Sequence, residues 1–190
     1  KHIFIGTMQI GKGNNFVDSN TAFGVSSLLQ NGSGAQNTAI GFETLKANDG
    51  GSNNVAIGYN ALTVNTTGSD NMGVGYNTLK ANVGGTGNSA IGSGSLASNT
   101  GGNYNTGVGQ QVMSAKDVGN SNTGVGYSSL ENNSGNYNTA VGSLALDANT
   151  TGAGNVAVGY NAGGALTTGG SNTVVGTNAL ITQTTVASNT

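Results

Sequence analysis

The chain has 190 residues, including 35 glycines, and a net charge of −2; only 6% of its residues are charged, against the ~25% of an average protein. It contains no arginine or cysteine, and its five lysines lie far apart in the sequence. This composition excludes a clustered basic face for nucleic acid, disulfides and thiolate chemistry, and no apolar run is long enough to insert into a membrane.

Residues 1–19 match the remainder of the chain only loosely, so we expect an irregular first segment there. Ile5-Gly6 and Ile10-Gly11 are partial copies of the later pattern. The regular pattern begins at Asn20 and is expected to form a repeat array over residues 20–190. Because Asn189-Thr190 stands where an eleventh unit would open, we expect the sequence to be a segment of a longer protein.

The repeat array is built from one phrase, seen in full from Asn54 to Leu62. Its first asparagine recurs every 17 residues, with one step of 16, at Asn20, Asn37, Asn54, Asn71, Asn88, Asn105, Asn122, Asn138, Asn155 and Asn172. A glycine follows each asparagine by four residues. A unit this short cannot hold the helix pair of the common helical repeats, which need ~33 to 47 residues. The sequence therefore predicts an all-β fold, a parallel β-solenoid or β-roll of about ten 17-residue coils.

A short strand is expected just before each of these glycines. Its last residue is Phe23 in the first repeat and is β-branched in the other nine, which favours a strand. These nine are Ile40, Ile57, Val74, Ile91, Val108, Val125, Val141, Val158 and Val175. The preceding residue is alanine or glycine, except Val174 in the last repeat. Since neighbours in a strand point to opposite faces, we interpret the branched face as core and the small face as a surface that another backbone approaches closely, within the coil or from another chain.

A second apolar row lies in the middle of the unit, at Leu28, Leu45, Leu62, Leu79, Leu96, Met113, Leu130, Leu146 and Leu180. The residue types around it are compatible with a strand or with one helical turn per coil. An asparagine three residues later, as at Asn48 and Asn65, predicts a corner, because asparagine tolerates the left-handed conformation. In the ninth unit Gly163 stands in the leucine position, and we expect Leu166 to replace the missing side chain.

The core of one such coil is thin. Two apolar side chains contribute ~1.5 to 3 kcal/mol each when buried, whereas ordering the backbone costs ~1 kcal/mol or more per residue. Stacking of the coils must supply the difference, and the face of small residues favours close packing of further chains. A homotrimer would meet both needs.

The phrase N-[TV]-A-[IV]-G-x-x-A-L followed by N-T-T-G is nearly intact at residues 54–68 and 138–152. It resembles the repeats of bacteriophage tail-fibre proteins, many of which end in an intramolecular-chaperone endopeptidase domain that is cleaved off after the fibre trimerises. It is also similar to the head repeats of trimeric autotransporter adhesins, which form a left-handed parallel β-roll in a trimer but repeat at a shorter interval. The resemblance covers residues 20–190, and the longer repeat favours the viral fibre.

This resemblance implies a homotrimeric fibre in a virion, acting as a structural shaft that presents a receptor-binding region for attachment to a host cell. The implied partners are further copies of the chain, other fibre or virion proteins, and a host surface glycan or protein receptor. The alternative is the head of a bacterial trimeric adhesin at the cell surface.

One candidate binding feature is an aromatic row just after the repeat glycine, formed by Tyr59, Tyr76, Tyr127 and Tyr160 together with Phe42. An exposed row of this kind is suited to gripping a glycan. The alternative interpretation is that the rings cover the edge of the coil or an interface between chains.

No catalytic, cofactor-binding or metal site is expected, and we predict that the chain is not an enzyme. His2 is the only histidine and stands at a terminus. The carboxylates are scattered; Glu131 and Asp147 share a repeat position in neighbouring units, which we interpret as like charges on a solvated edge. The aspartate of each coil in calcium-binding β-rolls is missing, so calcium is rejected as a structural ligand.

Two other functions remain open. An ice-binding solenoid would present a regular threonine array, which this chain offers at Thr21, Thr38, Thr106, Thr123, Thr139 and Thr173 but interrupts at Val55, Met72, Ser89 and Val156. An enzymatic depolymerase spike would require a clustered pair of carboxylates.

Overall fold

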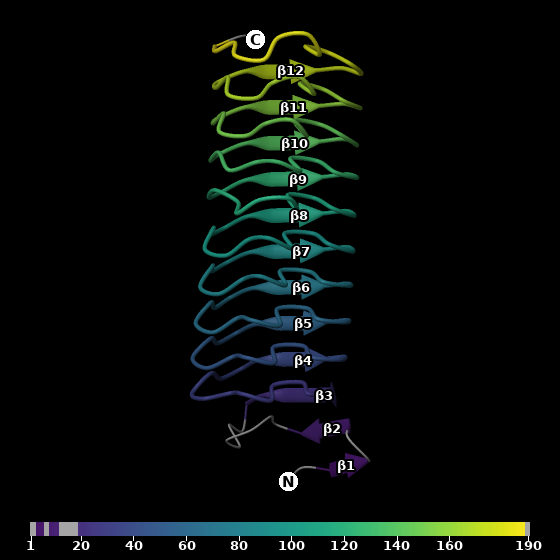
Figure 1. The fold of residues 1–190 in the computed structure, drawn as a ribbon, viewed down its shortest axis with the longest axis vertical. Helices are drawn as coiled ribbons and strands as arrows, with labels where there is room; N and C mark the ends of the chain where they lie inside the picture. Colours follow the sequence, from purple (N-terminus) through teal and green to yellow (C-terminus); the bar gives the residue numbers. More distant parts are fainter. Residues whose placement is uncertain (1–2, 6–7, 12–18, 189–190) are drawn as a thin grey trace.

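A single twelve-stranded β-sheet runs along one side of a rod in the computed structural model, which describes residues 3–5, 8–11 and 19–188 (Figure 1). The strands follow one another across the sheet in chain order. Their bounds are β1 Ile3–Ile5, β2 Met8–Gly11, β3 Thr21–Val25, β4 Thr38–Ile40, β5 Val55–Ile57, β6 Met72–Val74, β7 Ser89–Ile91, β8 Thr106–Val108, β9 Thr123–Val125, β10 Thr139–Val141, β11 Val156–Val158 and β12 Thr173–Val175.

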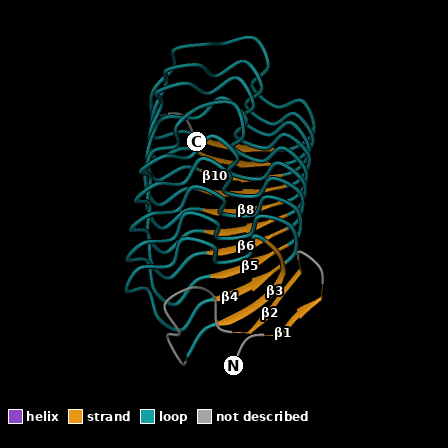
Figure 2. Cartoon of the chain, turned by 60° about the horizontal axis from the view of Figure 1, so that its bottom comes forward, coloured by secondary structure: helices purple, strands orange, loops and turns teal. Residues whose placement is uncertain are grey.

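The ten strands from β3 to β12 are parallel, and each pairs with the equivalent residues of the next coil. Ile40 pairs with Ile57, for example, and Ile57 with Val74. Nine such pairings join the ten strands, so the chain makes about nine turns of a solenoid. Figure 2 shows the strands forming one wall of the rod and the turns forming the others. The predicted parallel β-solenoid is confirmed, with about nine turns for the ten coils expected.

Two antiparallel strands extend the sheet at its N-terminal end, within residues 1–19. In β1 and β2, Ile3 lies opposite Ile10, and in β2 and β3, Gln9 lies opposite Gly24. The strand direction therefore alternates in this segment and becomes uniform where the repeats begin. His2 and Asn189-Thr190 lie outside the described residues.

The interior of each coil is lined by the small residues of the strand, which reverses the predicted assignment of the two faces. Ala39 and Ala56 are completely buried, whereas Ile40 and Ile57 are 37% and 36% exposed. The prediction that the branched residues form the core of the chain is wrong. The reason is space: a Cβ atom at Gly73 would already lie 3.1 Å from Oγ1 of Thr78 and 3.5 Å from the Leu62 side chain, so the strand has little room for more than alanine.

The wall opposite the strand carries the leucine row, which fills the interior. Its members from Leu28 to Leu146 are fully buried, and their backbones are left-handed, with φ between +46° and +53°. This segment is a turn in every coil, and the described residues contain no helix, which decides between the strand and the helical turn left open by the sequence. In the ninth unit Gly163 takes the left-handed position and Leu166 is fully buried, as expected.

No helix in the described part of the chain has the length and apolarity needed to cross a membrane.

The opening asparagines of the repeats form a buried row that bonds one coil to the next. Asn54 donates through Nδ2 to Oδ1 of Asn37 (3.1 Å) and to the carbonyl of Gly68 (2.9 Å). Its own Oδ1 accepts the backbone N–H of Asn71 (3.0 Å). A buried amide without partners would cost a few kcal/mol, so these bonds tie the register of the rod to the position of each asparagine.

The asparagines after the leucines form a second buried row. Asn65 donates to Oδ1 of Asn48 (2.9 Å) and to the same Gly68 carbonyl (2.8 Å). The prediction that they make a left-handed corner is wrong, because the left-handed residue is the leucine and the asparagine points inward. The row is interrupted where Lys116 stands; there Asn99 Oδ1 accepts the N–H of Gly102 from its own coil (3.1 Å).

Each of the strands β4–β12 ends just before the repeat glycine, where the chain turns in a conformation that L side chains rarely adopt. The φ angles of the ten repeat glycines lie between +119° and +146°. At Gly58 an added Cβ atom would lie 2.3 Å from the carbonyl oxygen of Gly75 in the next coil. The glycine is therefore required by both backbone conformation and coil spacing.

We predict that Gly58→Ala lowers the free energy of unfolding by about 3 kcal/mol, through backbone strain and displacement of the next coil. The matched control is Gly101→Ala, where the added Cβ would meet nothing within 4 Å. This control should leave stability unchanged or raise it by up to ~1 kcal/mol. Urea unfolding followed by circular dichroism measures the free energy of unfolding of both variants. Equal stability of the two would contradict the requirement for glycine at position 58.

Candidate functional site

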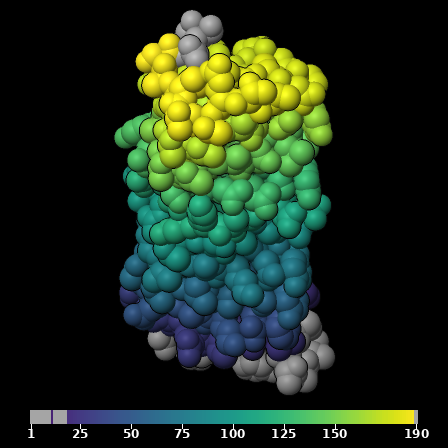
Figure 3. Space-filling view, turned by 45° about the horizontal axis from the view of Figure 1, so that its top comes forward, coloured from purple at the N-terminus to yellow at the C-terminus, as the bar shows by residue number. Residues whose placement is uncertain are grey.

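The outward side chains of β3–β12 form one continuous surface along the rod, which we call the outer sheet face. Each strand contributes two of them, at its first and third positions, because alternate residues share a face. The ten strands thus present two parallel rows. Figure 3 shows the coils following one another without interruption from one end of the rod to the other.

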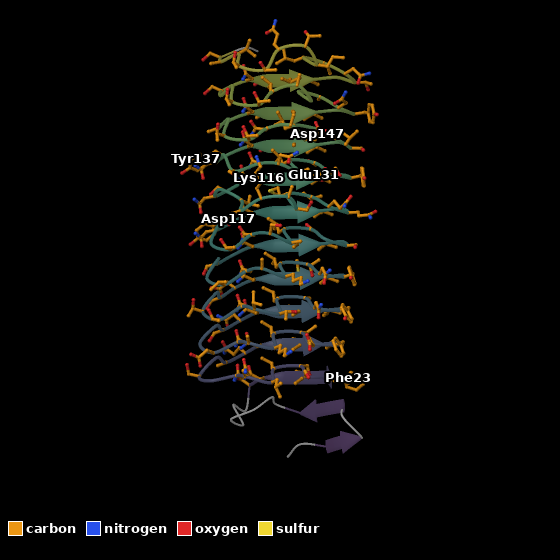
Figure 4. The ribbon with its side chains drawn as sticks, viewed as in Figure 1. Phe23, Lys116, Asp117, Glu131, Tyr137 and Asp147 are labelled. Carbon is orange, nitrogen blue, oxygen red and sulfur yellow. The ribbon has the colours of Figure 1, made fainter. Side chains whose placement is uncertain are left out.

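The third-position row is apolar in every coil, and we call it the branched row: Phe23, Ile40, Ile57, Val74, Ile91, Val108, Val125, Val141, Val158 and Val175. Val74 and Val125 are half-buried, and the other eight are 36–69% exposed. Phe23 marks its beginning in Figure 4. In-register pairing places each side chain against its equivalents in the coils on either side. The result is an unbroken apolar strip that the rod itself leaves uncovered.

The first-position row runs beside the branched row and is mixed: Thr21, Thr38, Val55, Met72, Ser89, Thr106, Thr123, Thr139, Val156 and Thr173. All ten side chains are exposed or half-buried. The threonines of this row therefore point out of the rod, as a surface array requires, with the interruptions that the sequence predicted.

The aromatic row lies just beyond the repeat glycines that follow the strands, and it is exposed. Tyr59, Tyr76, Tyr127 and Tyr160 are 45–56% exposed, and Phe42 is similar. The Phe42 and Tyr59 rings are stacked with centroids 5.0 Å apart, and those of Tyr59 and Tyr76 are 5.4 Å apart. Tyr59 is therefore covered on both faces, which leaves mainly its edge to a ligand, whereas Phe42 and Tyr76 are each stacked on one face.

Two further tyrosines stand at another position of the repeat. Tyr104 and Tyr137 precede the opening asparagine and are 67% and 68% exposed. Tyr137 points away from the rod on the side opposite the labelled Phe23 (Figure 4). They do not join the aromatic row.

Charged side chains are sparse in the described part of the chain. No group of three or more His, Cys, Asp or Glu among those residues is placed to hold a metal. Lys46 and Glu43 form a half-exposed ion pair of 2.8 Å within one turn. Glu131 and Asp147 do lie at the same position of neighbouring coils, as the repeat predicted (Figure 4).

Asp147 is held in an unfavourable place for a charge. Partial burial raises the pKa of its carboxyl above the ordinary value of 3.8. Backbone N–H groups of Ala148 and Asp147 lower this pKa in part, and the charge of Glu131 adds to the rise. Its Oδ1 atom is buried without a hydrogen-bond partner. This carboxylate therefore opposes folding slightly when ionised.

The sequence interpretation missed a second repeat glycine, at Gly34, Gly51, Gly68, Gly85, Gly102, Gly119, Gly135, Gly152 and Gly169. A Cβ atom at Gly68 would lie 2.4 Å from both Oδ1 of Asn65 and the carbonyl of Gly85. With glycine at this position, the Gly68 carbonyl accepts hydrogen bonds from Asn54 and Asn65, one from each asparagine row. The signal was present in the sequence, because this glycine usually follows the second asparagine by three residues.

Comparison of the chain with protein-family models, with curated proteins and with solved structures finds no match in any of the three.

We predict that Asp147→Asn stabilises the protein at pH 7. The raised pKa means that the folded state binds the proton more tightly than the unfolded state, so stability falls as pH rises from about 3.8 through the folded pKa. The substitution removes this loss, a gain of at most ~1 kcal/mol for a half-exposed group. Thermal unfolding at pH 7 and pH 3 measures it.

The gain should be absent at pH 3, where both forms are neutral. Asp70→Asn is the control, because Asp70 is exposed and already accepts a hydrogen bond from Asn53 (3.1 Å). A variant at Asp147 that is less stable than the original at pH 7 would show that the charge is needed.

Proposed function

We propose that this chain is a segment of a fibre shaft in which three copies pack together through their outer sheet faces. The observation that carries the proposal is the branched row, which is apolar in ten successive coils and exposed along the whole rod. Soluble monomers rarely leave an apolar strip of this length uncovered, whereas interfaces regularly use one.

The size of the outer sheet face fits an interface between chains. Two outward residues from each of ten strands give twenty, close to the ~20–30 residues per side of a standard interface. Burial of its apolar area contributes ~25 cal/mol per Å². The face is also uncharged at all twenty positions, so no ionised group would be desolvated.

This contact differs from the one that the sequence suggested. Alanine and glycine of the strand were expected to let chains approach closely, yet Ala39, Ala56 and Ala90 are completely buried within their own coils. The branched side chains take that role instead. Three outer sheet faces around a common axis would give the assembly a second core, made of Ile and Val, beside the thin core of each rod.

The mechanical role follows from the bonding along the rod. Every coil is joined to the next by backbone hydrogen bonds and by buried asparagine side chains, as between Asn48 and Asn65 (2.9 Å). Such a rod resists bending and transmits force along its axis. The resemblance to phage tail fibres makes a shaft in a virion, joined to other fibre proteins and presenting a receptor-binding region to a host cell, the specific form of this proposal. The head of a bacterial surface adhesin is the alternative, and a membrane anchor elsewhere in the parent protein would favour it.

We predict a mass near three chains when this segment is examined by sedimentation in the absence of denaturant. The double variant Ile57→Glu/Ile91→Glu should reduce the mass to one chain, because two groups of three carboxylates, one group at each position, would face one another at the interface. Since both side chains point outward, 36% and 41% exposed, the solenoid should stay folded by circular dichroism.

The matched control is Thr67→Glu/Thr151→Glu, which adds the same two charges at exposed positions on other walls of the rod. This control should keep the mass of three chains. A stable monomer for the unsubstituted chain would overturn the proposal.

An ice-binding function is the second candidate, favoured by one observation. The threonines of the first-position row lie in register on a sheet surface that faces outward, beside branched apolar side chains. If the chain binds ice, we predict measurable thermal hysteresis in dilute solution, and the double variant Thr106→Lys/Thr139→Lys should abolish it. A sedimentation mass of about three chains together with no thermal hysteresis would exclude ice binding and support the fibre shaft.

A further inference from the structure

The aromatic row contains a gap one ring wide. Along the row the residues are Phe42, Tyr59, Tyr76, Ser93, Gln110, Tyr127, Ser143, Tyr160 and Thr177. Ser143 stands between two tyrosines, one in each neighbouring coil. At the spacing of paired strands, two coils separate Tyr127 from Tyr160 by about 9.5 Å. The middle position, filled by a ring in the stack around Tyr59, is left open here.

The backbone at the gap repeats that of the filled stack. The N–H of Asn161 donates to the carbonyl of Ser143 (2.9 Å), and the N–H of Leu144 to that of Tyr127 (2.9 Å). In the filled stack Asn60 and Asn77 make the same bonds to Phe42 and Tyr59, also at 2.9 Å. The coil that is one residue shorter, which precedes Ser143, therefore leaves the corners in register.

A ring placed at the gap would meet both tyrosines at stacking distance. Midway between them it would lie about 4.8 Å from each ring, close to the 5.0 and 5.4 Å of the filled stack. Tyr127 and Tyr160 are 49% and 51% exposed, so solvent reaches them in the single chain. Ser143 supplies a hydroxyl at the base of the gap and no bulk.

From this geometry we infer that Tyr127 and Tyr160 hold a gluco-configured pyranose between their rings. A pyranose with equatorial hydroxyls has axial C–H groups on both faces, so each face packs on an aromatic ring, while the hydroxyls stay at the rim in contact with water and Ser143. A galactose-configured ring carries an axial hydroxyl on one face and fits worse. A nucleotide is disfavoured because the aromatic row contains no cation for its phosphate.

The site requires only one chain, so it stands apart from the proposed trimer. A tyrosine ring from another copy is the competing occupant, and it would block a sugar. The experiment below separates these occupants, and a mass measurement on the same sample shows whether the trimer forms.

Saturation-transfer NMR with methyl β-glucopyranoside tests the site in the full 190-residue chain. We expect weak binding, with a Kd of about 1–10 mM, and a signal at least fivefold lower for methyl β-galactopyranoside. Tyr127→Ala and Tyr160→Ala should each reduce the glucoside signal at least tenfold. Phe42→Ala, which removes the terminal ring of the filled stack and opens no gap between two rings, should leave it unchanged.

The sharpest variant fills the gap. Ser143→Tyr should abolish glucoside binding although both original tyrosines remain, and it should raise the unfolding temperature by completing a stack of three rings. Thr177→Tyr is the matched control, because it adds the same ring in the same row beside Tyr160, on the side away from Ser143, and leaves the gap open. No glucoside binding to the original chain, equal binding of the galactoside, or binding retained in the Ser143 variant would each overturn the inference.

Discussion

The buried asparagine rows are the constraint on which the remainder of the structure depends. A carboxamide in the interior costs free energy unless its donors and acceptor are all used, and here the partners of Asn54 lie in the coil before, the coil after and its own Gly68. A shift of one coil by one residue would break bonds on both sides. The polar half of the interior therefore fixes the register, and the apolar half only has to fill the space that remains.

That division explains why the strand of each coil turns its small face inward. Two asparagines and a leucine from the turns already occupy most of the interior, and the leucine side chain reaches the strand. The left-handed backbone of the leucine, which costs ~1–2 kcal/mol, is the conformation that aims it there. Burial of a whole leucine side chain, ~1.5–3 kcal/mol, offsets this cost at Leu62, which is fully buried with φ +53°.

The sequence was sufficient to predict the repeat, the solenoid, the repeat glycine after each strand and the replacement of Gly163 by Leu166, because each of them follows from the period of the repeat. The two faces of the strand were not, since alternation at Ala56-Ile57 separates the faces without saying which one is inside. Reasoning from hydrophobicity alone places Ile57 in the core, yet the space beside Leu62 admits only a small residue. The function of the second asparagine was likewise hidden, because a corner and an internal hydrogen bond give the same spacing.

The rows differ in how uniform their residue type is from coil to coil. This difference separates the residues that the folding of the rod requires from those that contacts outside the rod would require. The row of opening asparagines keeps one residue type in all ten coils because neighbouring coils share its hydrogen bonds. The aromatic row mixes Tyr59 with Ser93 and Gln110, as expected where one coil does not constrain the next. The branched row is exposed and yet apolar in all ten coils, although Thr123 on the same strand face shows that a polar residue is accepted there. Folding of a single chain does not explain that uniformity, whereas the proposed packing of further copies along the rod would account for it.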